Sequence, residues 1–320
     1  MTAPPAAVSI DVDALRLYGA IHGLGGIAPE ADPIYAAALP RFFELMAELG
    51  APATVFFIGE DVERAGPSLV RGLAETGSEL ASHSHTHDYR LSRQPPDRIR
   101  ADLEAAHRAL SAVAARAGRP APVGFRAPGY NTSPALLAAV AALGYRYDSS
   151  LLPAPAYWAA RAAALGLYTL RGRRSASLVG DLRAFAGPRA PYRTTPETPW
   201  RPDPAGPLVE VPMAVSPLTR VPIIGTSWAV LPAIARRRLL RRAIASRAPL
   251  VFEMHAIDLL DASDPGVPPD LAAAQPDLRR PVREKRPLFK ALFERLAGEV
   301  GLVRVCDLAA PPLTCAPAIE

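Results

Sequence analysis

Six side chains that can bind a metal ion or move a proton follow apolar segments of this sequence. Two aspartates end one segment, two histidines follow another, and an arginine and a further histidine end two more. They are Asp11, Asp13, His83, His87, Arg126 and His255. One aspartate with two histidines is a facial ligand set that leaves positions open for water and substrate. The pattern therefore predicts a catalytic metal site, which suits zinc and also iron, cobalt or manganese.

Some acidic and histidine side chains also have a plain structural interpretation. Asp11 and Asp13, taken alone, could simply cap the end of a strand. His85 points to the opposite side from its neighbours if the segment is extended, so it is predicted to be structural. His22 could reach the site, but is predicted to be a solvated loop residue. Glu253 is expected to alternate away from the site.

Short apolar segments that alternate with helical patterns must position the reactive side chains. Strands are predicted at residues 6–13, 53–59, 79–84, 124–127, 145–150, 208–215, 249–255 and 301–306. Helices are predicted at residues 32–50 with a kink at Pro40, 67–76, 97–116, 133–144, 231–247 and around 287–296. This alternation indicates a parallel α/β sheet or barrel. In such folds the catalytic groups gather at the carboxyl ends of the strands.

The segment 151–207 interrupts the alternation of strands and helices. It is rich in arginine and proline and is predicted to be an irregular insertion. Its aromatic residues could stack on sugar rings or form a small core of their own. No internal repeat or clean linker divides the chain, so we expect one domain over residues 1–320 with an insertion at about 151–207.

Composition and charge narrow the classes of partner. Hydrophobic residues make up 49% and charged residues 21%, which is typical of a globular protein. The net charge of +5 permits an anionic partner, but no nucleic-acid-binding motif accompanies it. Neither a secretion signal nor a membrane span is predicted, so a cytoplasmic location is expected. Five arginines within residues 228–242 lie beside apolar residues, which fits either peripheral contact with an anionic membrane or a solvated helix face.

Five segments, taken in order, resemble the motifs of the polysaccharide deacetylase (NodB-homology) family. They read SIDVD, ATVFFIG, ELASHSHTH, GFRAPGY and, in a later strand, FEMH. The resemblance covers roughly residues 6–150 and resumes near 208–255. It implies an α/β fold, a distorted (β/α) barrel of the NodB-homology type, that holds a divalent metal ion, most often zinc.

The resemblance implies a role for each residue of the metal site. The ligands would be Asp13, His83 and His87. Asp11 would be the general base that takes a proton from the attacking water, and Arg126 would orient this base.

The resemblance also implies residues that act on the leaving group and the oxyanion. His255 would be the general acid that protonates the departing nitrogen. Backbone amides near Gly129 and Tyr130 would help to hold the oxyanion. Ser84 would steady the histidine loop, and Asp148 would tune His255 or Arg126, although the family's usual tryptophan after this aspartate is missing.

The activity that these assignments imply is metal-dependent removal of an acetyl group from an amino sugar. Because no secretion signal is predicted, a soluble glycan precursor or a lipid-linked sugar fits better than a cell-wall polymer. A deformylase or cyclic-amide hydrolase of the same fold is the first alternative, since Glu253 and Met254 alter the final motif. A non-catalytic carbohydrate-binding protein is the second, but such a protein typically loses a ligand or the base.

Overall fold

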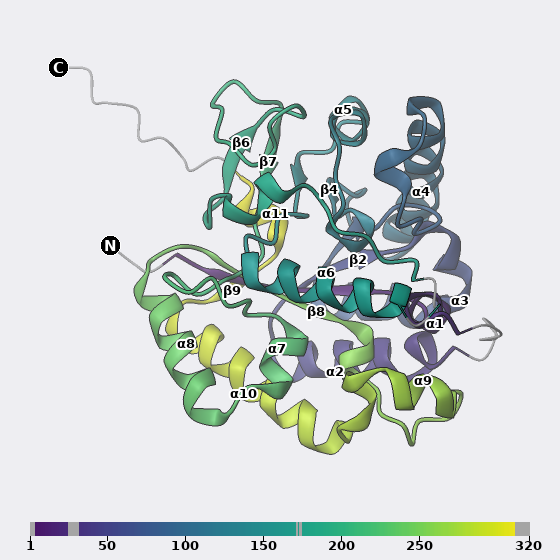
Figure 1. Cartoon of the computed structure of the whole chain (residues 1–320), viewed down its shortest axis with the longest axis vertical. Coiled ribbons are helices and arrows are strands. Elements are labelled where there is room, and N and C mark those ends of the chain that lie inside the picture. Colours follow the sequence, from purple (N-terminus) through teal and green to yellow (C-terminus); the bar gives the residue numbers. More distant parts are fainter. Residues whose placement is uncertain (1–3, 25–31, 171, 173–174, 311–320) are drawn as a thin grey trace.

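A mostly parallel β-sheet forms the centre of the computed structural model, which describes residues 4–24, 32–170, 172 and 175–310 (Figure 1). Its strands are β1 (Ala6–Val12), β2 (Thr54–Phe57), β3 (Glu79–Ser82), β4 (Gly124–Phe125), β5 (Tyr147–Asp148), β6 (Tyr192–Thr194), β7 (Leu208–Glu210), β8 (Leu250–His255) and β9 (Leu302–Val303). They follow the order β6-β7-β5-β4-β3-β2-β1-β8, and β9 pairs with β1. All pairs are parallel except β6 and β7, which are antiparallel.

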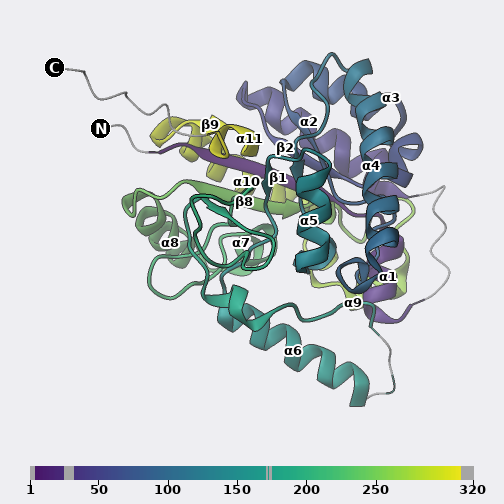
Figure 2. The same ribbon diagram turned by 90° about the horizontal axis from the view of Figure 1, so that it is seen from above.

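Helices surround the curled sheet, because parallel neighbours need long crossover connections (Figures 1 and 2). They are α1 (Leu15–His22), α2 (Leu39–Leu49), α3 (Val62–Thr76), α4 (Pro96–Arg116), α5 (Pro134–Ala142), α6 (Pro155–Leu170), α7 (Gly225–Val230), α8 (Ala233–Ala245), α9 (Pro269–Ala274), α10 (Val282–Glu299) and α11 (Val305–Leu308). None of the helices in the described part of the chain combines the length and apolar character that a bilayer span requires.

Strand β1 lies between β2 and β8 and carries Asp11 of the site. All seven of its residues are buried, so its sequence is nearly continuous in apolar residues rather than alternating. Its parallel register pairs Asp11 with Phe56 of β2 on one side and with His255 of β8 on the other. The carboxyl ends of three neighbouring strands therefore meet where the reactive side chains were predicted.

The sheet curls into an incomplete barrel. Beyond β7, Met213 donates its backbone N–H to Leu151 O at 2.9 Å, and Ala214 donates to Val251 O of β8, also at 2.9 Å. A bridge between Ile224 and Glu253 continues this contact along β8. A few hydrogen bonds thus connect the two edges in place of a full strand. The predicted distorted (β/α) barrel is confirmed.

One boundary signal behaved as expected, and a second did not. The Oγ of Ser133 accepts the backbone N–H of Leu136 at 3.2 Å and caps α5. Pro40 lies in the first turn of α2, directly after a π-helical turn at Ile34–Ala38. Because proline lacks an N–H, it is tolerated there, and the predicted kink becomes a change of helix type.

Two predicted elements were wrong. The insertion is not irregular throughout, since it contains α6 and β6. The final strand ends at Val303, because Asp307 accepts the N–H of Arg304 and starts α11. The basic helix predicted at residues 231–247 is confirmed as α8, which begins after Leu231–Pro232, where the residue before proline is extended.

Candidate active site

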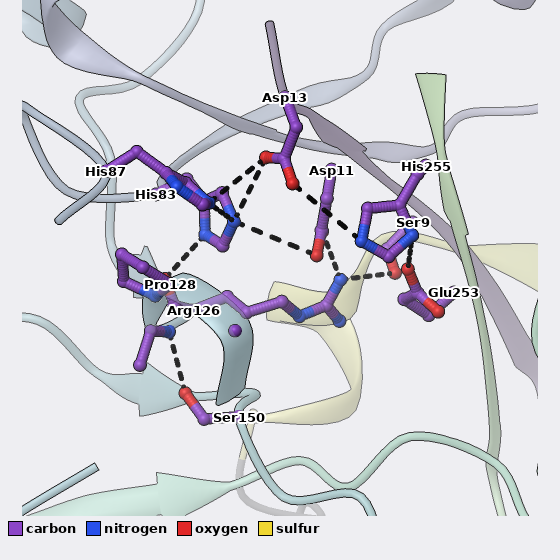
Figure 3. A network of polar contacts seen from close by, with 12 residues as sticks. Ser9, Asp11, Asp13, His83, His87, Arg126, Pro128, Ser150, Glu253 and His255 are labelled. Carbon is purple, nitrogen blue, oxygen red and sulfur yellow. Dashed lines mark hydrogen bonds and ion pairs between the residues drawn. The ribbon is translucent and has the colours of Figure 1, made fainter. Parts of the chain in front are cut away.

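The loop after β3 presents two histidines through an unusual backbone conformation. Ser84 and His87 have φ of 65° and 53°, in the left-handed region that non-glycine residues rarely adopt. The Oγ of Ser84 accepts the N–H of His87 at 3.0 Å, as expected for a residue that steadies this loop. The tight turn brings the side chain of His87 back beside that of His83, as Figure 3 shows.

Two ligand atoms from this loop and one from Asp13, the residue after β1, converge on one point (Figure 3). The Oδ1 of Asp13 lies 3.4 Å from Nε2 of His83 and 3.3 Å from Nε2 of His87, and the two nitrogens are 3.2 Å apart. Ligand bonds of about 2.0–2.1 Å at tetrahedral angles separate ligand atoms by about 3.3–3.4 Å. Asp13 Oδ1 is buried and has no hydrogen-bond partner among the described residues. The three side chains therefore fit a zinc-sized ion.

Hydrogen bonding and charge prepare this triad for a cation. The Nδ1–H of His83 donates to Arg126 O at 2.7 Å, which leaves Nε2 free to act as a ligand. Burial would raise the pKa of Asp13, but His87 and His83 hold that pKa well below its usual range. A second group of candidate ligands, Asp11, Glu253 and His255, is already engaged in the ion pairs described below.

Replacing His87 by alanine should abolish stoichiometric metal binding, because only two of three protein ligands remain. His85→Ala is a matched control. The His85 side chain lies beside Gly59 and is not part of the group formed by Asp13, His83 and His87, and its backbone N–H donates to Asp102. Metal content per chain after dialysis against zinc distinguishes the two variants, and equal metal loss in both would contradict the proposed ligand set.

Asp11 is held by a buried ion pair. Arg126 NH1 donates to Asp11 Oδ1 at 2.5 Å and to Ser9 Oγ at 3.1 Å, and its NE and NH2 donate to the backbone oxygen and hydroxyl of Ser149. The guanidinium also lies 4.0 Å from the centre of the Phe56 ring. Burial raises the pKa of Asp11, an effect that Arg126 and His83 oppose without cancelling. A carboxylate with a raised pKa accepts a proton more readily.

Arg126→Met should lower the free energy of unfolding by about 3–5 kcal/mol, because Asp11 would remain buried without its counter-charge. Chemical denaturation measures this loss. Arg304→Met removes an exposed pair with Asp307 at 2.8 Å and should cost less than about 1 kcal/mol. Equal losses in the two variants would show that Arg126 contributes no more than a surface ion pair.

The expectation that Glu253 faces away from the site was wrong. Its Oε1 lies 2.9 Å from Nδ1 of His255, and its carboxylate is completely buried (Figure 3). Residues two apart on a strand share a face, so the strand period itself predicts this pair. Burial lowers the pKa of His255, but the Glu253 carboxylate, together with Asp13 and Asp11, raises that pKa well above its usual value. The imidazole side chain is 25% exposed, and its Nε2 lies 3.8 Å from Asp13 Oδ2.

The turn after β4 supports the site differently from what was predicted. The N–H of Tyr130 donates to Ala127 O at 2.9 Å, so it is committed within the turn rather than free to hold an oxyanion. Asp148 accepts a hydrogen bond from Ser150, whose hydroxyl accepts the N–H of Ala127. Asp148 therefore supports this turn. Burial raises the pKa of Asp148 and the charge of Arg126, one of its two predicted partners, acts to lower it, whereas Glu253 lies beside His255, the other predicted partner.

A cavity of about 240 Å³ opens above the triad. Tyr157 and Arg161 of α6 line one wall. Gln275 and Asp277, around the turn η8 (Pro276–Arg279), line another. Gly129 also borders the cavity, and its φ of 58° suits glycine.

His22 was predicted to be solvated, and the structure contradicts this. It ends α1 and is buried, with Nδ1 at 2.9 Å from Tyr168 OH of α6 and Nε2 at 2.7 Å from Gln275 Oε1. These contacts join α6 to the opposite wall of the cavity. His22 is separated from Tyr168 by 146 positions in the sequence and from Gln275 by 253 positions. No local sequence pattern predicts contacts over such separations.

A family comparison agrees with the geometry of the site. Residues 30–147 match the model of a family described as polysaccharide deacetylase. The resemblance to the polysaccharide deacetylase family is confirmed. The matched region includes the histidine loop and the arginine segment, whereas Asp11, Asp13 and His255 lie outside it.

One solved structure supports the fold, and two others show a weaker similarity. One, from Mycobacterium smegmatis and assigned as a polysaccharide deacetylase, has 17% identity and a TM-score of 0.57, and the match covers 99% of this chain and 96% of that one. A family 4 carbohydrate esterase from Streptomyces lividans, in complex with acetate, has 14% identity and a TM-score of 0.43 over 95% and 93% of the chains. A family 4 pseudoenzyme from Bacillus anthracis has 11% identity and a TM-score of 0.47 over 96% and 66%.

Proposed function

We propose that this protein is a metal-dependent N-deacetylase that hydrolyses the acetamide of an amino sugar. The observation that carries the proposal is the convergence of a three-residue metal-ligand group, a buried Asp11–Arg126 pair and a Glu253–His255 pair on one cavity. Asp13, His83 and His87 would hold the ion, for which we propose zinc. When bound, the ion would supply Lewis-acid polarisation of the amide carbonyl and of the attacking water.

The remaining side chains divide the proton transfers between them. Asp11, whose Oδ2 has no hydrogen-bond partner among the described residues, accepts a proton from the water that attacks the carbonyl carbon. Arg126 orients the other carboxylate oxygen. His255 donates the proton of Nε2 to the departing nitrogen while Nδ1–H remains bonded to Glu253. The C–N bond then breaks, and acetate and a free amine are formed.

The dimensions of the cavity favour one sugar-sized group. Its volume of about 240 Å³ is below the roughly 300–1,000 Å³ of typical ligand pockets. Its walls carry donors and acceptors that suit hydroxyl groups, with Arg161 and Ser177 on one side and Gln275 and Asp277 on the other. An amino sugar in a soluble precursor, or at the end of a lipid carrier, fits this enclosure better than the middle of a long polymer.

Acetate release by the zinc-loaded protein tests the proposal. The substrates are N-acetyl amino sugars presented free and attached to a lipid, and the matching N-formyl compounds are included. Acetate from at least one compound supports an N-deacetylase, and that compound identifies the form of the substrate. Release of formate alone would show that the protein is a deformylase rather than an N-deacetylase. Saturable sugar binding without hydrolysis would indicate a carbohydrate-binding protein.

The cytoplasmic location and the membrane contact of the basic segment remain proposals. Helix α8 exposes Ile234 together with Arg237, Arg238, Arg241 and Arg242, which fits either a membrane surface or a solvated face. Cell fractionation, with the wild type compared against an Arg237→Glu, Arg241→Glu variant, separates these two possibilities.

A further inference from the structure

Helix α6 has an inner face that belongs to the active-site cavity. It crosses the front of the molecule in Figure 1 and stands out from the sheet in Figure 2. The buried and half-buried residues are Tyr157, Trp158, Arg161, Leu165 and Tyr168. Their spacing of three and four positions places them on one helical face. On this face Tyr157 and Arg161 line the cavity, Trp158 packs against Tyr130, and Tyr168 contacts His22.

The outer face of α6 is exposed and carries no charge. Its exposed residues are Pro155, Ala156, Ala159, Ala160, Ala162, Ala163, Ala164, Gly166, Leu167, Thr169 and Leu170. Leu167 is 45% exposed and Leu170 is 86% exposed. A helix on the surface of a soluble domain normally turns charged side chains outward. A continuous apolar surface of this kind marks an interaction with a partner or a membrane.

The charge of the neighbouring sequence distinguishes between these partners. Residues 151–180 contain four arginines and no aspartate or glutamate, and Arg171, Arg173 and Arg174 directly follow the helix in sequence. Apolar side chains next to a cationic run complement the acyl region and the anionic headgroups of a bilayer. We propose that the outer face of α6 inserts into the surface of an anionic membrane.

The position of α6 connects this surface to the active site. Tyr157 and Arg161 line the cavity from its inner side, and Arg161 NH1 lies 3.4 Å from Gly129 O. A helix is about 10 Å across with its side chains, so a bilayer on the outer face lies about one helix diameter from the cavity. A lipid-linked amino sugar could therefore enter without leaving its membrane. This choice of substrate rests on the proposed function, whereas the membrane contact does not.

Flotation of the full-length chain with lipid vesicles tests the membrane contact. Vesicles of phosphatidylcholine alone are compared with vesicles that also contain phosphatidylglycerol, and the wild type is expected to float with the second. Leu167→Glu with Leu170→Glu should lower the bound fraction about tenfold or more, because anions replace the inserted apolar groups. Ala112→Glu with Ala115→Glu adds the same charge to exposed positions of α4 and should leave binding unchanged.

Three results would overturn the proposal for α6. The first is a wild type that floats with neither kind of vesicle. The others are an equal loss of vesicle binding in the α4 control, and a loss of vesicle binding only in the Arg237→Glu, Arg241→Glu variant of α8. A dimer in light scattering that the two leucine substitutions dissociate, without vesicle binding, would assign the face to a second copy. Circular dichroism and zinc content confirm that each variant is folded. Flotation needs no turnover, so failure of the deacetylase assay leaves this test intact.

Discussion

Asp11→Asn is expected to lower kcat by about 10²- to 10⁴-fold while the zinc content of the protein stays that of the wild type. Asparagine can still accept the hydrogen bond that Arg126 NH1 makes to this position at 2.5 Å. The amide cannot, however, take a proton from water near neutral pH. Because the ligand atoms come from Asp13, His83 and His87, the metal site should survive the substitution. Steady-state kinetics and elemental analysis of the same preparations make the comparison.

Asp61→Asn is the matched control for this substitution. Asp61 is also a buried aspartate paired with arginine, but its partners, Arg16 and Arg64, do not line the cavity. The kcat of the Asp61→Asn variant should stay close to that of the wild type even if the free energy of unfolding of this variant falls. Loss of zinc in Asp11→Asn would make Asp11 a ligand rather than the base, and an unchanged kcat would remove it from the proton transfers.

Glu253→Gln is expected to lower kcat/KM by about 10²- to 10⁴-fold and to change its pH dependence. In the wild type, burial lowers the pKa of His255, and the Glu253 carboxylate, with smaller contributions from Asp13 and Asp11, raises it above its usual value. A general acid must be protonated, so kcat/KM falls as the pH rises through this pKa. Removing the charge of Glu253 lowers the pKa of His255, and the alkaline limb should therefore move to lower pH.

A pH profile of kcat/KM separates this role from simple misfolding. A structural defect would lower the rate by the same factor at every pH and leave the limb in place. Glu79→Gln is the control, since Glu79 is likewise buried but bonds Thr54 and Tyr147 at the start of β3, away from the cavity. An unmoved alkaline limb in Glu253→Gln would contradict the assignment of Glu253 as the residue that sets the pKa of His255.

The positions of the reactive residues were determined by the sequence itself. Asp11, Asp13 and His83 follow buried apolar segments, and the carboxyl ends of parallel strands meet at one edge. This rule needs only the order of the strands, not their detailed packing. The same local reasoning, applied correctly, predicts the pairing of Glu253 with His255, because a strand repeats every two residues.

The tertiary structure decided the features that depend on distant parts of the chain. The contacts of His22 with Tyr168 and Gln275 join segments whose separation leaves no local periodicity to detect. The sequence also could not predict that the outer face of α6 is exposed, because an alanine-rich helix has the same residue pattern whether its outer side is covered or exposed. Local periodicity determines which side chains share a face, but the free energy of packing decides what that face contacts, and packing joins residues that are far apart in the chain.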